Sequence, residues 1–177
     1  MNDKWYFPVD NQVAVLPDEK GSFAYERKYH THEGIDLYAE QGSNVYACED
    51  GEVVLVEWFT GEKAGFPCWN NTQAVLVLGK SGVIVYGEIT TDLIEGHTVS
   101  RGDLIGQVET VLKKDKGRPM SMLHLELHKP ESRSTFEWLP DESKNEVLLD
   151  PTKYIEDAFI ERFGKNSLSN ARYNFTE

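Results

Sequence analysis

The sequence predicts an all-β fold, an antiparallel sandwich or partly open barrel that ends in a helix. Through the middle of the chain, apolar residues alternate with polar ones or form short runs, as they do in strands. Glycine, asparagine or aspartate bounds these runs, so the strands are short and closely spaced, which is typical of sandwiches and barrels. Near the C-terminus the apolar residues recur at helical spacing instead.

Strands are expected at regular intervals along the first three quarters of the chain. Their expected ranges are 11–16, 34–38, 44–48, 51–58, 73–80, 82–89, 104–110 and 121–128. Turn-forming residues separate several of them, at 41–44, 49–51, 80–82 and 100–103. The close spacing favours antiparallel neighbours, because short turns join antiparallel strands.

Residues 60–72 break this rhythm. They hold two glycines, a proline and the aromatic pair Phe66 and Trp69, with no apolar period. Two interpretations remain open: an inserted loop that forms the wall of a binding groove, or a surface hairpin with Trp69 folded onto the barrel. Residues 129–145 are polar and contain two prolines, so they predict an extended connection.

The end of the chain predicts one helix. Asp150 is expected to be its N-cap and Pro151 its first residue. The helix then carries an apolar stripe as far as Phe163 that docks on the sheet, and Gly164 is expected to end it. We expect residues 1–163 to form a single domain and residues 164–177 to form a loose tail.

Composition excludes several classes of function. The net charge of −12 argues against binding to nucleic acid or to anionic membranes, because both need clustered lysine and arginine. No apolar stretch is long enough to cross a bilayer. The sequence starts at Met1 without a secretory leader, so we expect a cytoplasmic protein; a cell-wall location would require that a leader had been removed. The two cysteines, Cys48 and Cys68, are then expected to be free thiols, with Cys48 buried.

Two short segments carry ligands for a metal ion. In an extended chain, alternate residues share a face, so His32, Gly34 and Asp36 point one way, with Gly34 leaving room for an ion. In the last strand, Met122, His124, Glu126 and His128 share a face opposite three leucines. Two imidazoles and a carboxylate are the ligands of a catalytic zinc ion whose fourth position is open to water. The alternative is chance proximity, since five histidines are scattered over an acidic chain.

Several motifs resemble those of one family in the same order. The run from Phe23 to Arg27 and on through His32-Glu33-Gly34-Ile35-Asp36-Leu37 resembles the first metal motif of the lysostaphin/LytM-type metallopeptidases. Leu123-His124-Leu125-Glu126 resembles the end of their HxH motif. The other similar segments are 7–9, 42–54 and 99–106.

The resemblance implies the fold of that family, the duplicated hybrid motif, and a zinc ion held by His32, Asp36 and His124. It also implies hydrolysis of a peptide, commonly a glycine-rich or stem-peptide cross-link of peptidoglycan, by a metal-activated water. The expected partner is therefore a peptide or a peptidoglycan-derived substrate.

Two positions depart from the family pattern. Met122 stands where HxH has its first histidine, and Glu88 stands where a YxHL element has its histidine. A thioether cannot transfer a proton, whereas a carboxylate is the general base of other zinc peptidases. Glu88 therefore either takes the role of base, with Tyr86 assisting through a hydrogen bond to a carbonyl or merely packing, or closes the metal site as a fourth ligand. The first choice predicts an enzyme, and the second a zinc-binding recognition or regulatory module without activity.

The remaining polar residues near these motifs have simpler expected roles. Glu126 either orients a ligand histidine or is an ordinary strand carboxylate. His30 is expected to be a solvated neighbour of the site, His128 to line the groove, and His97 to lie in a turn.

Overall fold

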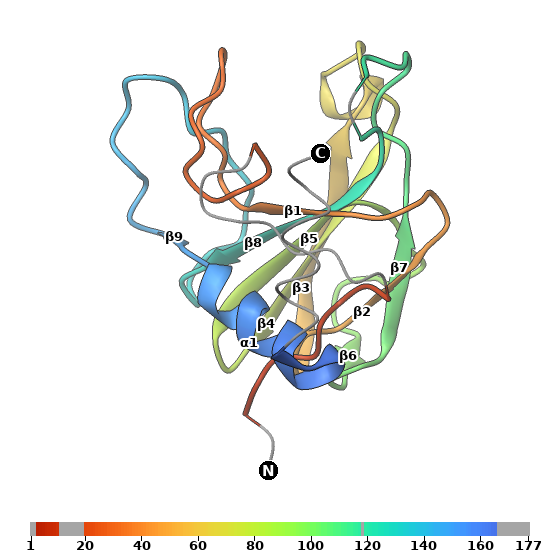
Figure 1. Ribbon diagram of the computed structural model, residues 1–177, viewed down its shortest axis with the longest axis vertical. Coiled ribbons are helices and arrows are strands. Elements are labelled where there is room, and N and C mark those ends of the chain that lie inside the picture. The colour runs from red at the N-terminus through yellow and green to blue at the C-terminus, as the bar shows by residue number, and fades with distance from the viewer. Residues whose placement is uncertain (1–2, 11–19, 118, 166–177) are drawn as a thin grey trace.

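Across its described residues, the protein forms an open sheet of nine strands, followed by one helix (Figure 1). The computed structural model describes residues 3–10, 20–117 and 119–165. The strands are β1 (Ile35–Tyr38), β2 (Asn44–Tyr46), β3 (Gly51–Thr60), β4 (Thr72–Gly79), β5 (Gly82–Thr90), β6 (Thr98–Val99), β7 (Leu104–Val108), β8 (Met122–His128) and β9 (Leu148–Leu149). A single 3-10 turn, η1 (Glu62–Ala64), follows β3, and α1 (Thr152–Phe163) follows β9.

The described strands pair antiparallel throughout. Along the sheet their order is β1-β8-β5-β4-β3-β6, while β2 pairs with β7, β7 also with β5, and β9 with β8. In the centre of the sheet, His124 of β8 lies opposite Gly87 of β5, and Glu126 lies opposite Val85. This register decides which residues share a face with the candidate ligands.

The main hydrophobic core lies on one face of the sheet. Leu123, Leu125 and Leu127 of β8 point into it, as alternate positions of a strand should. The helix covers this core with Ile155, Ala158 and Phe159, and the N-terminal segment covers it with Trp5, Phe7 and Val9. In Figure 1 the helix and the N-terminal segment lie together in front of the sheet.

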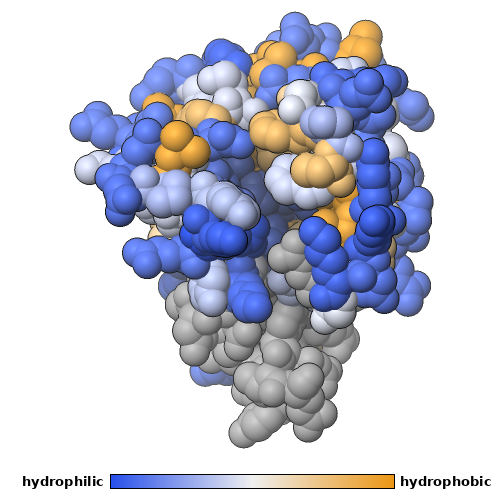
Figure 2. Space-filling model, turned by 90° about the horizontal axis from the view of Figure 1, so that it is seen from above, coloured by the Kyte–Doolittle hydropathy of each residue, from blue (hydrophilic) through white to orange (hydrophobic). Residues whose placement is uncertain are grey.

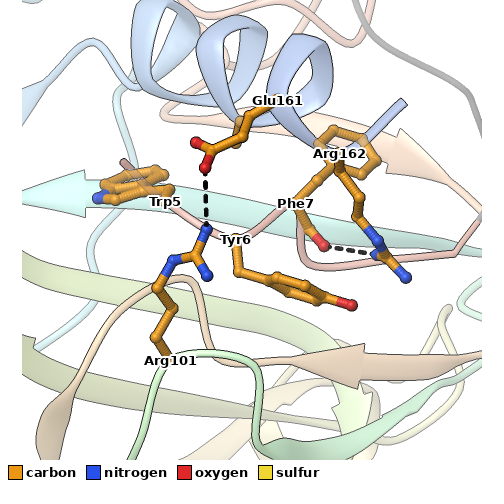
Figure 3. A pocket seen from close by; sticks show the side chains of 7 residues that line it. Trp5, Tyr6, Phe7, Arg101, Glu161 and Arg162 are labelled. Atoms are coloured by element: carbon orange, nitrogen blue, oxygen red, sulfur yellow. Dashed lines mark hydrogen bonds and ion pairs between the residues drawn. The ribbon is translucent and has the colours of Figure 1, made fainter. Parts of the chain in front are cut away.

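Two arginines fasten the N-terminal segment between the helix and the sheet (Figure 3). The side chain of Tyr6 lies near both guanidinium groups, 4.4 Å from that of Arg162 and 5.4 Å from that of Arg101. Arg162 also donates to the carbonyl oxygen of Phe7, and Arg101 pairs with Glu161 of the same helix. These cation–π and ionic contacts keep the N-terminal segment packed over the main hydrophobic core.

The opposite face carries the candidate site beside a smaller apolar cluster. Ala74, Leu76, Val83 and Val85 form this cluster. Figure 1 shows two long connections, 20–34 and 129–147, side by side at one end of the molecule. They are joined where the Thr31 N–H donates to the Trp138 carbonyl and where the rings of Phe23 and Trp138 meet.

The predicted all-β fold with a C-terminal helix is confirmed. The expected and observed strands differ mainly in where each strand begins and ends. Seven of the expected strands are present with shifts of a few residues at their ends, whereas the expected strand at 11–16 lies outside the described residues. The two-residue strands β6 and β9 were not anticipated, since so short a pairing leaves no periodic pattern.

The helix begins one residue later than expected. Pro151 occupies the N-cap position and Thr152 is the first helical residue, although Asp150 still accepts a hydrogen bond from the Thr152 N–H. Gly164 ends the helix as predicted, with a φ of 88° and its N–H bonded to the Ile160 carbonyl. Residues 166–177 of the expected tail lie outside the described ranges.

The segment after β3 is a structured end of a hairpin. Phe66 and Trp69 lie with ring centroids 5.6 Å apart, and Trp69 forms a bridge with Leu112 of the neighbouring connection. Within the three described ranges, no helix is both long and apolar enough to cross a membrane.

Candidate metal centre

Three side chains converge on one point on the face opposite the main core. His32 Nε2 lies 3.1 Å from Asp36 Oδ1 and 3.2 Å from His124 Nδ1. His124 Nδ1 and Asp36 Oδ1 are 3.0 Å apart, which closes the triangle. A tetrahedral zinc ion with bonds of about 2.0–2.1 Å separates its ligand atoms by about 3.3 Å, so this triangle fits zinc. The sequence-predicted ligands are therefore brought together as a set.

Strand pairing positions two of the three ligands. Asp36 of β1 and His124 of β8 are directly opposite in the register, so their side chains share a face at short distance. His32 precedes β1 in a connection fixed by backbone bonds between His32 and residues Ala24 and Tyr25. All three side chains are buried, with exposures of 1% for His32, 3% for Asp36 and 5% for His124.

The hydrogen bonds on the far sides of the two rings fix where their lone pairs point. His32 Nδ1 lies 2.9 Å from the carbonyl oxygen of Ser22, which only accepts, so Nδ1 carries the proton. His124 Nε2 lies 2.8 Å from Glu126 Oε1, and a carboxylate likewise accepts, so Nε2 carries the proton there. In the neutral rings, His32 Nε2 and His124 Nδ1 therefore both direct lone pairs at the same point as Asp36 Oδ1.

Three electron pairs facing one another in a buried site need a positive charge between them. Burial alone would raise the pKa of Asp36, but His32 and His124 outweigh it and hold that pKa well below its ordinary value. Burial would lower the pKa of His124, but hydrogen bonds to Asp36 and Glu126 raise it well above its ordinary value. Without metal the cluster thus takes up a proton, and a divalent cation that binds would displace it.

Glu88 reaches the same face through a bulge in β5. Gln73 pairs with Ile89 but Val75 pairs with Tyr86, so β5 has one extra residue at this point. Glu88 has a φ of 63°, a left-handed conformation that is strained for a residue with a side chain. The residue is half-buried, yet its Oε2 atom is shielded from solvent and has no hydrogen-bond partner in the described structure.

The environment of Glu88 favours its protonated form. Burial, followed by the charge of Asp36, raises the pKa of Glu88 to about 8. The ligand atoms of His32, Asp36 and His124 lie within 4.8 Å of one another, and this group of atoms does not include Glu88. In this arrangement of the described residues the Glu88 carboxyl group is therefore not part of the three-residue cluster, although the charge of Asp36 acts on its pKa.

Tyr86 does not belong to the site, which corrects the expected role of this residue in catalysis. It pairs with Leu125 and points with it into the main core, where it is fully buried. Its hydroxyl oxygen accepts a hydrogen bond from the Cys48 N–H at 2.8 Å. The bulge explains the error, because the positive φ at Glu88 breaks the alternation that would put Tyr86 and Glu88 on one face.

Gly34 also has a different role from the one expected. A Cβ atom added there would lie 2.2 Å from the Leu125 carbonyl oxygen, so the glycine admits the backbone of β8 rather than an ion. This close approach of the chain before β1 to β8 brings the two halves of the ligand set together.

Of the three histidines outside the cluster, one lies in the expected kind of position and two do not. His97 lies in a turn as predicted, where its N–H donates to the Ile94 carbonyl. His30 is half-buried rather than solvated, and burial followed by the charge of Arg27 lowers its pKa to about 4. His128 is fully buried and does not line a groove.

Two residues that hold the ligands were not singled out in the sequence. One Arg27 nitrogen lies 2.9 Å from Asp36 Oδ2 and donates also to the Lys20 carbonyl, so Arg27 fixes the carboxylate from behind. Ser22 acts through its backbone carbonyl, which any residue type supplies, so no signal in the sequence could have found it. Arg27 had a signal, since it lies within the first motif.

The connections before β1 and after β8 reach one end of the molecule, and this end is hollowed (Figures 1 and 2). Figure 2 looks onto this end and shows a recess between two raised sides. In Figure 1 the connections 20–34 and 129–147 lie on one side of this end, and the segments 60–72 and 110–117 on the other. Phe59 of β3 packs its ring 5.5 Å from that of His124, so the second side also contacts a ligand.

Comparison with solved structures shows a shared fold. The described fold is similar to that of a protein described as a glycyl-glycine endopeptidase lytM from Ruminococcus gnavus, with a TM-score of 0.55 and 22% identity over 88% of this chain and 62% of that one. It is similar to the catalytic domain of the antimicrobial peptidase lysostaphin from Staphylococcus simulans, with a TM-score of 0.52 and 17% identity over 78% of this chain and 90% of that one. A zinc containing peptidase from Vibrio cholerae gives a TM-score of 0.51 and 21% identity over 70% of this chain.

Several of the matched proteins are much longer than this one. The chain spans 36% of the Vibrio cholerae chain, and 38% and 54% of two further matched chains. No curated protein sequence gives a significant match.

A family assignment comes from the sequence itself. The sequence model of peptidase family M23 matches residues 30–136, which is more than half of the chain and contains all three candidate ligands and Glu88. The matched range also agrees with the motifs around His32 and His124 and with the lysostaphin-type fold. The chain therefore belongs to peptidase family M23, the lysostaphin/LytM-type family.

Proposed function

We propose that this protein is a zinc-dependent peptidase that hydrolyses peptide bonds in glycine-rich or peptidoglycan-derived substrates. The observation that carries the proposal is the triangle of His32 Nε2, Asp36 Oδ1 and His124 Nδ1, whose sides are 3.0–3.2 Å long. Both rings are held in the tautomer that turns a lone pair inward. Three inward-facing lone pairs favour the binding of a cation between them.

Zinc suits the donors better than other common divalent ions. Two imidazole nitrogens and one carboxylate oxygen match zinc, whereas magnesium and calcium prefer oxygen donors alone. Bound zinc would act as a Lewis acid, lowering the pKa of a coordinated water and polarising a peptide carbonyl. The protein's part is to hold the three ligands in place around the ion.

Glu88 is the residue that we assign to proton transfer. Its Oε2 atom is buried and without a partner, so it is available to accept a proton from a water beside the ligand cluster. A pKa of about 8 leaves it poised between its two forms near neutral pH, which suits a group that takes a proton and returns it. The bulge directs this carboxyl group toward the ligands, and strain in a backbone at such a position is common at functional sites.

The substrate class rests on the family and on the shape of the end that carries the site. Family M23 is a family of peptidases, and the structures with similar folds include an antimicrobial peptidase, lysostaphin. The recess in Figure 2 runs between two raised sides, a shape that accommodates an extended chain. A substrate with small side chains, such as glycine, would bring its backbone nearest to the buried ligands.

The test compares zinc content and hydrolysis in four proteins. Wild type, His124→Ala, Glu88→Gln and the control Glu52→Gln, an exposed carboxylate of β3, are purified and loaded with zinc. Zinc is measured by mass spectrometry, and hydrolysis by the release of amines from pentaglycine and from peptidoglycan. We expect wild type and Glu52→Gln to bind one zinc and to release amines, and His124→Ala to do neither.

Glu88→Gln separates the two interpretations of this residue. If Glu88 is the base, the variant keeps its zinc and loses about 10²-fold or more in rate. If the variant loses its zinc, Glu88 is a ligand and the closed, inert site is the correct description. Wild-type protein that binds one zinc but hydrolyses neither substrate would favour a zinc-binding module over an enzyme.

A further inference from the structure

Three polar residues follow one another along the site face of β8. His124, Glu126 and His128 alternate with the leucines of the main core and are all buried, with exposures of 5%, 2% and 0%. Buried histidines and carboxylates are stable only when they are paired with one another or with other polar groups. Here each member of the row contacts the next.

Hydrogen bonds connect this row into a chain with a defined direction. Glu126 Oε1 lies 2.8 Å from His124 Nε2, and Glu126 Oε2 lies 2.6 Å from His128 Nε2. The carboxylate therefore accepts one N–H from each ring. Ser132 Oγ lies 2.7 Å from His128 Nδ1 and 3.3 Å from the Ser134 carbonyl oxygen, so toward the neutral ring its hydroxyl donates mainly across the shorter contact, to Nδ1. This assignment gives every donor an acceptor.

The far end of the chain is anchored in the connection that follows β8. Ser132 is 7% exposed, and its backbone N–H donates to the Lys129 carbonyl. Phe136 of the same connection stacks on the ring of His128, with centroids 5.2 Å apart and an interplanar angle of 29°. The ring of His128 is thus fixed both by a hydrogen bond at its edge and by packing on its face.

We infer that Glu126, His128 and Ser132 form a positioning relay that holds His124 as a metal ligand. Glu126 keeps the proton of His124 on Nε2 and so keeps the lone pair of Nδ1 directed at the ligand cluster, while His128 and Ser132 keep Glu126 in place. The inference rests on the zinc site proposed above and assigns no contact with substrate to these residues. Partners of this kind typically change metal affinity about 10–100-fold when they are removed.

The first measurement is the affinity for zinc. It is determined by competition with a chelator for wild type, His128→Phe, His128→Gln, Ser132→Ala and the control Ser81→Ala. Ser81 is partly buried and bonds to Glu49 and Trp5, away from the ligands, so its variant loses a hydroxyl without touching the relay. Thermal unfolding of the zinc-free proteins shows which variants fold.

The relay predicts a graded result. His128→Phe keeps the ring packed on Phe136 but removes the N–H, so the affinity for zinc should fall about 10–100-fold. His128→Gln retains an N–H donor and should recover part of this loss. Ser132→Ala should weaken binding by a smaller factor, and Ser81→Ala should bind as wild type does. Equal affinity of all folded variants would overturn the inference while leaving the zinc site intact.

The second measurement needs no catalytic activity. Nitrogen-15 NMR of the histidine rings in the zinc-loaded protein reports which nitrogen carries the proton. Wild type should show His124 protonated at Nε2, and His128→Phe should show exchange between forms or a shifted resonance. An unchanged His124 resonance in that variant would contradict the relay. Wild-type protein that binds no zinc would overturn both the zinc site and the relay.

Discussion

His32 Nε2 and His124 Nδ1 lie 3.2 Å apart although the residues are separated by ninety-one others, and the proton of each ring is held on the opposite nitrogen. Two neutral imidazoles in this arrangement repel each other, and the nearby oxygen of Asp36 adds to the repulsion. Without metal a proton taken up by the cluster relieves this repulsion, since hydrogen bonds to Asp36 and Glu126 raise the pKa of His124, and a divalent cation would take the place of that proton. This relation between the two rings explains why ligand binding and stability should be linked.

Zinc should raise the thermal stability of the protein. A ligand that binds only the folded state at about 100 times its Kd adds about 2.7 kcal/mol to the free energy of unfolding. For a chain of this size, that corresponds to a rise in Tm of about 5–10 °C. Scanning calorimetry with added zinc and with a chelator measures it, and Asp36→Asn should lose most of the rise. The same rise in Asp36→Asn would place the zinc elsewhere on the protein.

Arg27 should contribute to the affinity for zinc without being a ligand. It holds Asp36 Oδ2 at 2.9 Å, which leaves Oδ1 facing the two histidines. Arg27→Met keeps much of the aliphatic stem and removes the guanidinium group, so we expect the affinity for zinc to fall about 10-fold. Lys28 is an exposed neighbour of Arg27, so Lys28→Met serves as the control for the loss of one positive charge. The prediction is wrong if both variants change the affinity by the same factor.

The fold and the proximity of His32, Asp36 and His124 could be predicted from the sequence, because both depend on strand alternation and on the order of short motifs along the chain. Alternation in β8 correctly separated His124 and Glu126 from the leucines, and regular strand pairing does bring Asp36 opposite His124. The short strands β6 and β9 escaped prediction, since pairs of two residues depend on tertiary contacts rather than on a local period.

The errors at Tyr86 and His128 have different physical sources. Alternation assigns a face only while the strand stays regular. Tyr86 lies opposite Leu125 on the core side, and the extra residue in β5 at Glu88 ends the alternation that would keep both side chains on one face. A positive φ at a glutamate leaves no mark in the sequence, because glycine is the residue normally expected there. His128 does share the face of His124, but the connection 129–138 covers it with Phe136 and Ser132, and such burial by a non-periodic segment cannot be inferred from spacing.

Gly34→Ala should damage the metal site through the backbone. The added Cβ would lie 2.2 Å from the Leu125 carbonyl oxygen and 2.9 Å from the Glu126 side chain, so the chain before β1 must move away from β8. We expect a loss of about 1–3 kcal/mol in stability together with weaker zinc binding. Gly42→Ala is the control, because its positive φ of 86° also disfavours alanine but a Cβ there meets no atom within 4 Å. Loss of stability in both variants, with weaker zinc binding only in Gly34→Ala, is the expected result.

Met122→His should show whether the missing histidine limits the rate. Met122 begins β8, is half-buried and lies on the same face as His124, so an imidazole there would reach the region beside the ligands without occupying the triangle. If Glu88 transfers the proton alone in the wild type, the added histidine supplies a second group for that step or for stabilising developing charge, and kcat should rise about 10-fold or more. The zinc content should stay the same, which the purified variant can show directly. Met122→Gln, which adds a polar group of similar length that cannot transfer a proton, is the matched control. A rise in both variants would mean that polarity alone limits the wild type, and a rise in neither would mean that the missing histidine does not limit the rate.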